Sequence, residues 1–172
     1  MPPSRPFRFD PLKGLEALLY ISSRLPEDFY KVLKVLYFAD KYHLENYGRL
    51  ICGDHYIAMR SGVVPSGLYD FVKDVRDPRR QPTHGVDAKE ALALEGHRLV
   101  PKREARLEFF SETDRECLDR AIEEMRTMDW TTLKVKTHGP DYEAADLDDE
   151  VPFDAIARTL PNGELLLKAL RS

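Results

Sequence analysis

The sequence predicts an α+β fold, mainly helical, in which a single domain surrounds a buried central helix and carries a small antiparallel β-sheet or hairpin. Three observations predict this class. Apolar residues recur every three or four positions in several segments, as they do on one face of an α-helix. Short apolar segments interrupted by glycine lie between the helical segments and are typical of hairpins. One hydrophobic core can organise a chain of 172 residues, so we expect residues 1–172 to form one domain.

The first two helices are predicted by the residues at their ends. Asp10–Pro11 is typical of a helix start, and leucines at helical spacing continue from there until the break at Pro26. Glu27–Asp28 suits the positive end of a second helix, because carboxylates there interact favourably with the helix dipole. Gly48 is expected to end this second helix, which is the longest element of the chain.

The second helix is predicted to be the central one. Four of its charged residues fall within one narrow sector at about 100° per residue, so nearly all of the rest of its circumference can be buried. We therefore expect this helix to be buried on every side except the charged sector, with most of its aromatic residues in the core. The charged residues of the sector are Lys31, Lys34, Lys41 and Glu45.

The segment after the central helix alternates between apolar and turn-forming residues. Leu50–Met59 predicts a short strand or hairpin that is broken at Gly53–Asp54. Residues 62–67 predict a constrained turn, and the apolar spacing of Leu68–Val75 predicts a third helix with Ser66 as its cap. The glycines in this region permit backbone conformations closed to other residues, and Asp54 can accept hydrogen bonds from neighbouring amides.

The second half of the chain predicts a hairpin and several shorter helices. Ala91–Val100 is split by Glu95–Gly96 into two apolar runs, which is typical of a β-hairpin. Ser111 with Asp114 forms a capping-box pattern at the start of a fourth helix, and we expect Trp130 to close that helix. Prolines and glycines restrict residues 131–172 to short helices. The leucines expected to pack at the end of the chain are Leu165, Leu166 and Leu170.

Composition and charge favour a protein partner over nucleic acid or a membrane. The net charge is −4, and the excess is C-terminal: residues 111–172 carry 8 Lys and Arg against 15 Asp and Glu. Nucleic-acid binders usually show a concentrated basic face, whereas an acidic surface attracts a basic partner. No apolar run approaches the roughly 20 residues of a membrane span. We expect a cytoplasmic protein whose cysteines, Cys52 and Cys117, are reduced and partly buried.

A search for reactive groups predicts no catalytic residue, no metal site and no cofactor. Cys52 and His55 lie close in sequence, but side chains alternate faces in an extended segment and would point apart. The histidines form no chelating pair. Neither of the two glycine-rich phosphate-binding motifs, GxGxxG and GxxxxGK(S/T), occurs in the sequence. A basic cluster ends the third helix, where cations favour the negative end of the dipole. This cluster comprises Lys73, Arg76, Arg79 and Arg80, with Asp74 and Asp77 among them.

One part of the sequence carries a specific pattern. A leucine-rich helix ends in Tyr37–Asp40, and a Gly-Asp-x-Tyr-x-Ala segment and a turn closed by Pro65 follow before a tyrosine-containing helix. This pattern closely resembles the Panacea domain, the family of SocA-like antitoxins, most strongly over residues 29–75. Val63 stands where that family commonly has a first proline, which leaves Pro65 to fix the turn. A weaker resemblance continues through the Ser111 helix and residues 137–140.

The resemblance implies a bacterial or prophage antitoxin that neutralises a cognate toxin by direct contact, with a protease or a chaperone as a further partner. We expect a partner-binding surface built from the turn at residues 62–69 and the segment Asp54–Arg60. One alternative is a DNA-binding regulator that uses the C-terminal helices and the basic cluster. Another is a hydrolase built on Cys52. The expected partner-binding residues are Asp54, Tyr56, Arg60, Val64, Pro65, Ser66 and Tyr69.

Overall fold

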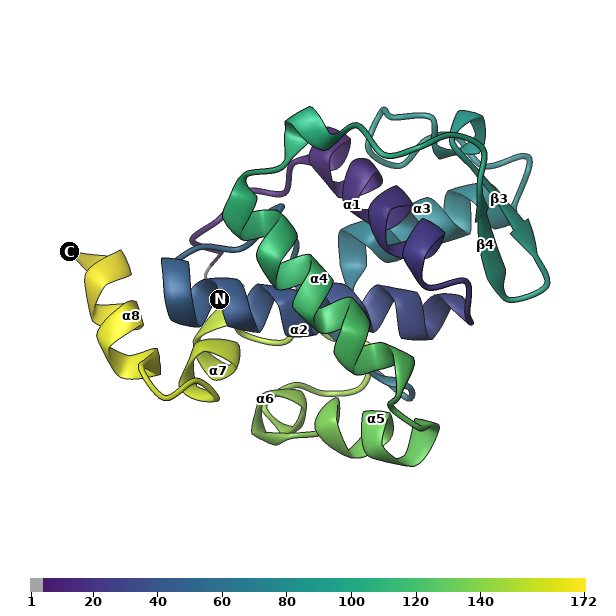
Figure 1. Ribbon diagram of the computed structural model, residues 1–172. Helices are drawn as coiled ribbons and strands as arrows, with labels where there is room; N and C mark the ends of the chain where they lie inside the picture. Colours follow the sequence, from purple (N-terminus) through teal and green to yellow (C-terminus); the bar gives the residue numbers. More distant parts are fainter. Residues whose placement is uncertain (1–4) are drawn as a thin grey trace.

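The computed structural model describes residues 5–172 and places one long helix, α2 (Phe29–Tyr47), through the middle of the molecule (Figure 1). The described residues contain eight α-helices, four short strands and two short 3-10 helices. The remaining helices are α1 (Pro11–Arg24), α3 (Ser66–Arg76), α4 (Glu112–Arg126), α5 (Trp130–Lys136), α6 (Pro140–Glu143), α7 (Phe153–Arg158) and α8 (Gly163–Arg171). The strands are β1 (Tyr56–Met59), β2 (Gly62–Pro65), β3 (Leu92–Glu95) and β4 (Arg98–Pro101).

The predicted helix boundaries are confirmed where local chemistry sets them. The Asp10 carboxylate accepts a hydrogen bond from the amide of Lys13 at the start of α1. Asp28 caps α2 in the same way, and Gly48 ends α2 in the left-handed region at φ +79°. The α4 capping box is complete, because the Ser111 and Asp114 side chains each accept the other residue's amide.

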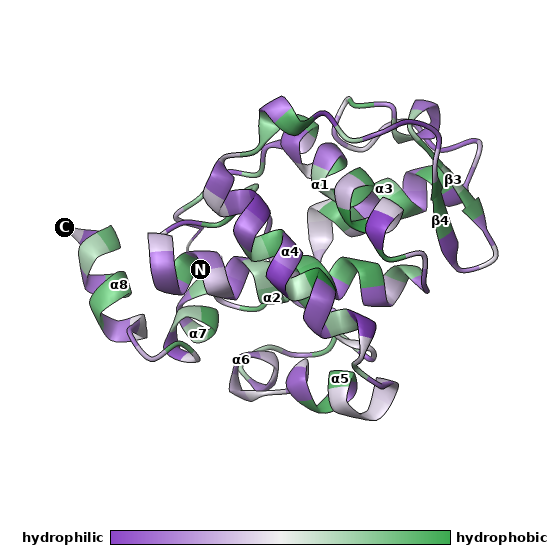
Figure 2. Ribbon diagram, in the orientation of Figure 1, coloured by the Kyte–Doolittle hydropathy of each residue, from purple (hydrophilic) through white to green (hydrophobic). Residues whose placement is uncertain are grey.

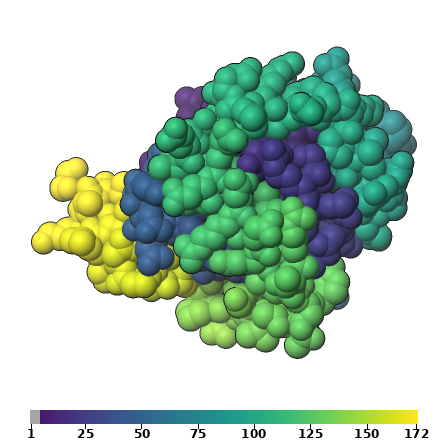
Figure 3. Space-filling model, viewed as in Figure 1, coloured from purple at the N-terminus to yellow at the C-terminus, as the bar shows by residue number. Residues whose placement is uncertain are grey.

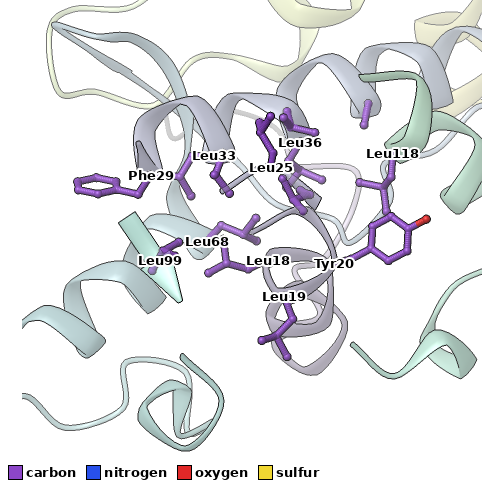
Figure 4. Close-up of a cluster of buried hydrophobic side chains, with 14 of the residues drawn as sticks. Leu18, Leu19, Tyr20, Leu25, Phe29, Leu33, Leu36, Leu68, Leu99 and Leu118 are labelled. Atoms are coloured by element: carbon purple, nitrogen blue, oxygen red, sulfur yellow. The ribbon is translucent and has the colours of Figure 1, made fainter. Parts of the chain in front are cut away.

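Two apolar clusters lie against α2. The larger one fills the space between α1, α2, α3 and α4, where Leu18, Leu33 and Leu68 meet (Figure 4). The smaller one joins the other side of α2 to the β1–β2 hairpin, α7 and α8. Polar and apolar residues are interleaved along the ribbon of α4 (Figure 2). Its buried residues, among them Leu118 and Ile122, belong to the larger cluster together with residues of α2. With all atoms drawn, α4 and its neighbours cover most of α2, and α8 projects at one side (Figure 3).

The α+β class and the buried central helix are confirmed, but the expected small sheet is two separate antiparallel hairpins. β1 pairs with β2, and β3 pairs with β4. The turn predicted at residues 62–67 is wrong in its first part, because Gly62–Pro65 is itself strand β2. The chain reverses direction at Arg60 and Ser61. Gly62, the first residue of β2, follows with φ +111°.

The charged sector of α2 is not the open side that the sequence predicts. Lys34 is 1% exposed, because the chain from α5 to α6 crosses this side of the helix. Lys31 is 6% exposed and pairs with Glu27. The ammonium of Lys34 lies 3.5 Å from the Thr137 hydroxyl, and the Tyr37 hydroxyl donates to Asp141. Polar contacts therefore attach this covering segment to α2.

Two expectations about the C-terminal part are wrong. Trp130 does not close α4, which ends at Arg126; it begins α5 and is 53% exposed. Of the three leucines expected to pack, only Leu166 is buried, where it joins Leu167 in the smaller apolar cluster. Leu165 and Leu170 are 70% and 37% exposed. No helix among residues 5–172 has both the length and the apolarity needed to cross a bilayer.

Candidate partner-binding site

The predicted site is organised by Asp54, whose carboxylate is buried beneath the start of α3. It accepts hydrogen bonds from the amides of Gly67 at 2.7 Å and Leu68 at 3.0 Å, the second and third residues of that helix. It also accepts the amide of His55 at 2.8 Å. Burial raises the pKa of the Asp54 carboxyl to about 7, and the amide hydrogen bonds oppose that rise.

Ser66, the cap expected from the sequence, does not cap α3. It is the first residue of that helix, and its side chain makes no capping hydrogen bond. Asp54, twelve residues earlier, satisfies the free amides in its place. The expectation that Asp54 binds backbone amides is confirmed, and its donors are the neighbouring amide of His55 and two amides at the start of α3.

A second buried carboxylate, Asp40 of α2, fixes the other end of the same loop. It accepts the amide of Ile51 at 2.8 Å and the hydroxyl of Tyr56 at 2.6 Å. Burial raises the pKa of the Asp40 carboxyl to about 7, while both hydrogen bonds lower it. Asp40 and Asp54 therefore hold residues 51–56 at fixed positions between α2 and α3.

Four of the seven expected partner-binding side chains lie inside the protein. Asp54 and Tyr56 are each 2% exposed, Val64 is fully buried, and Pro65 is buried as well. These side chains cannot contact a partner in this conformation, because they form the hairpin core and the loop's hydrogen bonds. Arg60, Ser66 and Tyr69 remain accessible.

The three accessible residues have different neighbours. The Arg60 carbonyl faces the His138 ring beside α5, with 3.1 Å between the oxygen and Nε2. The Tyr69 hydroxyl lies 3.2 Å from that of Tyr30, on the side where α2 begins. The amide of Ser66 donates to the carbonyl of His55 at 2.8 Å. Only Ser66 therefore adjoins the loop that Asp54 fixes.

Both edges of the β1–β2 hairpin are covered by later parts of the chain. The amide of Val63 in β2 donates to the carbonyl of Thr137 at 3.0 Å. The amide of Ala58 in β1 donates to the backbone carbonyl of Asp149, and the amide of Val151 donates to the backbone carbonyl of Tyr56 in β1. A partner strand therefore has no open edge of this hairpin to extend.

A surface cleft of about 490 Å³ lies beside His55 and was missed by sequence reasoning. The N-terminal segment before α1 forms one wall, and the His55 loop and His84 form the other. The alternation of arginine and aromatic residues in the N-terminal segment is the one sequence signal for this cleft, and it does not tell where the segment docks. The side chains that give the cleft its character are Arg5, Phe7, Arg8, Phe9, His55 and His84.

The two cysteines are free and buried, as expected. Cys52 is 3% exposed, and burial raises the pKa of its thiol well above the usual value. The imidazole of His55 lines the cleft. Burial lowers the pKa of this imidazole, and the positive charge of Arg5 lowers it further. In the described part of the chain, no three metal-ligating side chains form a cluster.

The basic cluster at the end of α3 is interspersed with carboxylates. Lys73 pairs with Asp70 at 3.2 Å, and Arg80 pairs with Asp74 at 2.9 Å. Arg79 lies 3.5 Å from the carboxylate of Asp77. These pairs neutralise much of the charge that a phosphate backbone would need.

The comparisons with known proteins give one family. The model of the antitoxin SocA-like Panacea domain matches residues 32–143, about two thirds of the chain, from α2 through α6. Neither the curated proteins nor the solved structures include a significant match. The matched region contains both buried carboxylates, the β1–β2 hairpin and α3. The chain therefore belongs to the family of SocA-like antitoxins with a Panacea domain.

Proposed function

We propose that this protein neutralises a protein toxin by binding it directly, without catalysing a reaction on it. The observation that carries the proposal is the family match over residues 32–143. The fold is compatible with this role, because two buried carboxylates and two apolar clusters hold the matched region in one rigid arrangement. A rigid scaffold binds a partner without a large ordering cost.

The chemistry of the described residues supports binding rather than catalysis. The Cys52 thiol is buried and its pKa is raised, so it lacks the exposed thiolate that a nucleophilic cysteine needs. The DNA-binding alternative has less support, because the cations of the basic cluster pair with neighbouring carboxylates.

The test is co-expression with the product of the neighbouring gene, which is the expected toxin. The protein should restore growth to cells that make the toxin, and the two chains should elute as one complex in size-exclusion chromatography. A toxin that stays lethal and elutes separately would contradict the proposal. Binding of duplex DNA that weakens steeply with salt would instead favour the regulator.

Binding can neutralise the toxin by covering its active surface or by delivering it to a protease. The two routes differ in the lifetime of the toxin. If the toxin is covered, it should persist at unchanged abundance in rescued cells when synthesis is stopped and its decay is followed by immunoblotting. Rapid decay that requires this protein would favour delivery.

A further inference from the structure

The cleft beside His55 is a built feature, because the N-terminal segment is fitted onto the loop that follows α2. The amide of Asp10 donates to the carbonyl of Cys52 at 2.9 Å. A side chain at Gly53, where φ is +73°, would place its Cβ 2.0 Å from the carbonyl oxygen of Arg8. The backbone on both walls is thus held in contact, which fixes the place from which the Arg8 side chain extends.

The ring of Phe9 also holds the N-terminal segment in place, because it packs against α1 and α3. A Cβ at Gly14 of α1 or at Gly67 of α3 would come within 2.7 Å or 2.5 Å of this ring, so only glycine leaves room for it. The ring also packs against His84, with 5.0 Å between ring centroids. Phe9 therefore anchors the segment at the meeting point of α1 and α3.

The lining of the cleft contains two arginines and two histidines and no carboxylate. Arg5 pairs with Glu150, and the Nε2 atom of His84 lies 2.9 Å from Asp70, so these two groups have partners. Arg8 makes no ion pair and its side chain makes no hydrogen bond to any other residue between positions 5 and 172.

The ring of His55 is also free to bind. Its Nδ1 atom is 3.9 Å from the Asp54 carboxylate, which is too far for a hydrogen bond, and its side chain is 25% exposed. Two hydrogen-bond donor groups, a guanidinium and an imidazole, thus line one cleft without partners among the described residues. A carboxylate accepts from both kinds of donor and matches the local charge.

We infer that this cleft receives an acidic side chain of the toxin, an Asp or Glu that binds Arg8 and His55. This inference rests on the proposed function and specifies where and how the partner is recognised. The accessible residue Ser66 adjoins the cleft through its hydrogen bond to His55, so the expected surface at the start of α3 is contiguous with it.

The experiment measures the affinity of the purified toxin for the wild-type chain and for Arg8→Glu and His55→Gln. Arg126→Glu, a matched charge reversal on α4 outside the cleft, is the control. Arg8→Glu should weaken binding at least tenfold and His55→Gln several-fold, whereas the control should stay within twofold. Unchanged urea midpoints would show that each variant is folded.

Charge reversal on the toxin completes the test. Replacing the matching acidic residue of the toxin by arginine should weaken binding to the wild type and restore binding to Arg8→Glu. If the wild type binds the toxin and both cleft variants bind within twofold of it, the inference is wrong and the proposed function stands. If the wild type does not bind, the proposed function itself fails. Unchanged toxin affinity in both cleft variants, together with Arg8-dependent binding of inorganic phosphate, would make the cleft a small-anion site and overturn the inference.

Discussion

Replacing Asp54 by alanine is expected to destabilise the protein more than any other single change near α3. The carboxylate serves three backbone amides, and the residues that follow Pro65 in α3 supply two of them. Gly67 and Leu68 are both buried, so water cannot replace the lost acceptor without opening the loop. The substitution therefore leaves two buried donors unsatisfied at the positive end of a helix.

The magnitude follows from those two donors. A buried group left without its hydrogen-bond partner costs about 1–3 kcal/mol, and loss of a helix N-cap costs about 0.5–2 kcal/mol. The cost of the unsatisfied donors and the cost of the lost cap concern the same amides and are therefore not added in full. We expect Asp54→Ala to lower the free energy of unfolding by about 2–4 kcal/mol. Asp54→Asn keeps one acceptor oxygen and should cost about half as much.

The assay is urea denaturation followed by circular dichroism, with Ser66→Ala as the matched control. Ser66 has the position and chemistry of a cap in the sequence, yet its side chain makes no capping hydrogen bond. Its removal should change the free energy of unfolding by less than about 0.5 kcal/mol. A larger loss for Ser66→Ala than for Asp54→Ala would refute this account of the start of α3.

Three further predictions concern buried groups. Lys34→Met should raise the free energy of unfolding by about 1–3 kcal/mol, because burial lowers the pKa of the ammonium to about 8 and no carboxylate pairs with it among the described residues; a lower urea midpoint would contradict this. Stability should fall as the pH rises from about 4 to about 7, because the Asp54 carboxyl binds its proton more tightly in the folded state, where its pKa is about 7 against an ordinary 3.8. Urea midpoints at pH 5 and pH 8 measure this fall, which should be smaller in Asp54→Asn; an equal fall would assign it to other groups. Cys52→Ala should neutralise the toxin as well as the wild type does in the growth assay, and loss of rescue by a folded variant would revive a role for the thiol.

The starts of α1, α2 and α4, the end of α2 and the hairpin of β3 and β4 could be predicted from sequence because short-range chemistry sets them. Asp28 and Gly48 act on amides and carbonyls within a few residues of themselves, so their identity and spacing are enough. The same holds for the Ser111 capping box. The central position of α2 followed from its apolar circumference.

The candidate site could be located only in part. The segment from Asp54 to Tyr69 was identified by pattern, but most of its side chains turned out to be internal. Alternation of small and apolar residues is common to buried and exposed segments, so the pattern does not tell which residues face a partner. Arg8 and His84 lay outside the segment, and the alternation of arginine and aromatic residues around Arg8 does not tell where the N-terminal segment docks.

By itself, the sequence determined most of the elements, the helix ends that local caps set, the family pattern, and the absence of a chelating or nucleophilic motif at short spacing. The tertiary structure decided which acceptor caps α3, which side of α2 is covered, and which residues from three distant segments line one cleft. The physical reason is the distance along the chain over which each interaction acts. Capping and periodicity act over one or two helical turns, whereas burial of Lys34 or the approach of Arg8 to His55 depends on packing between segments that the chain brings together only when folded.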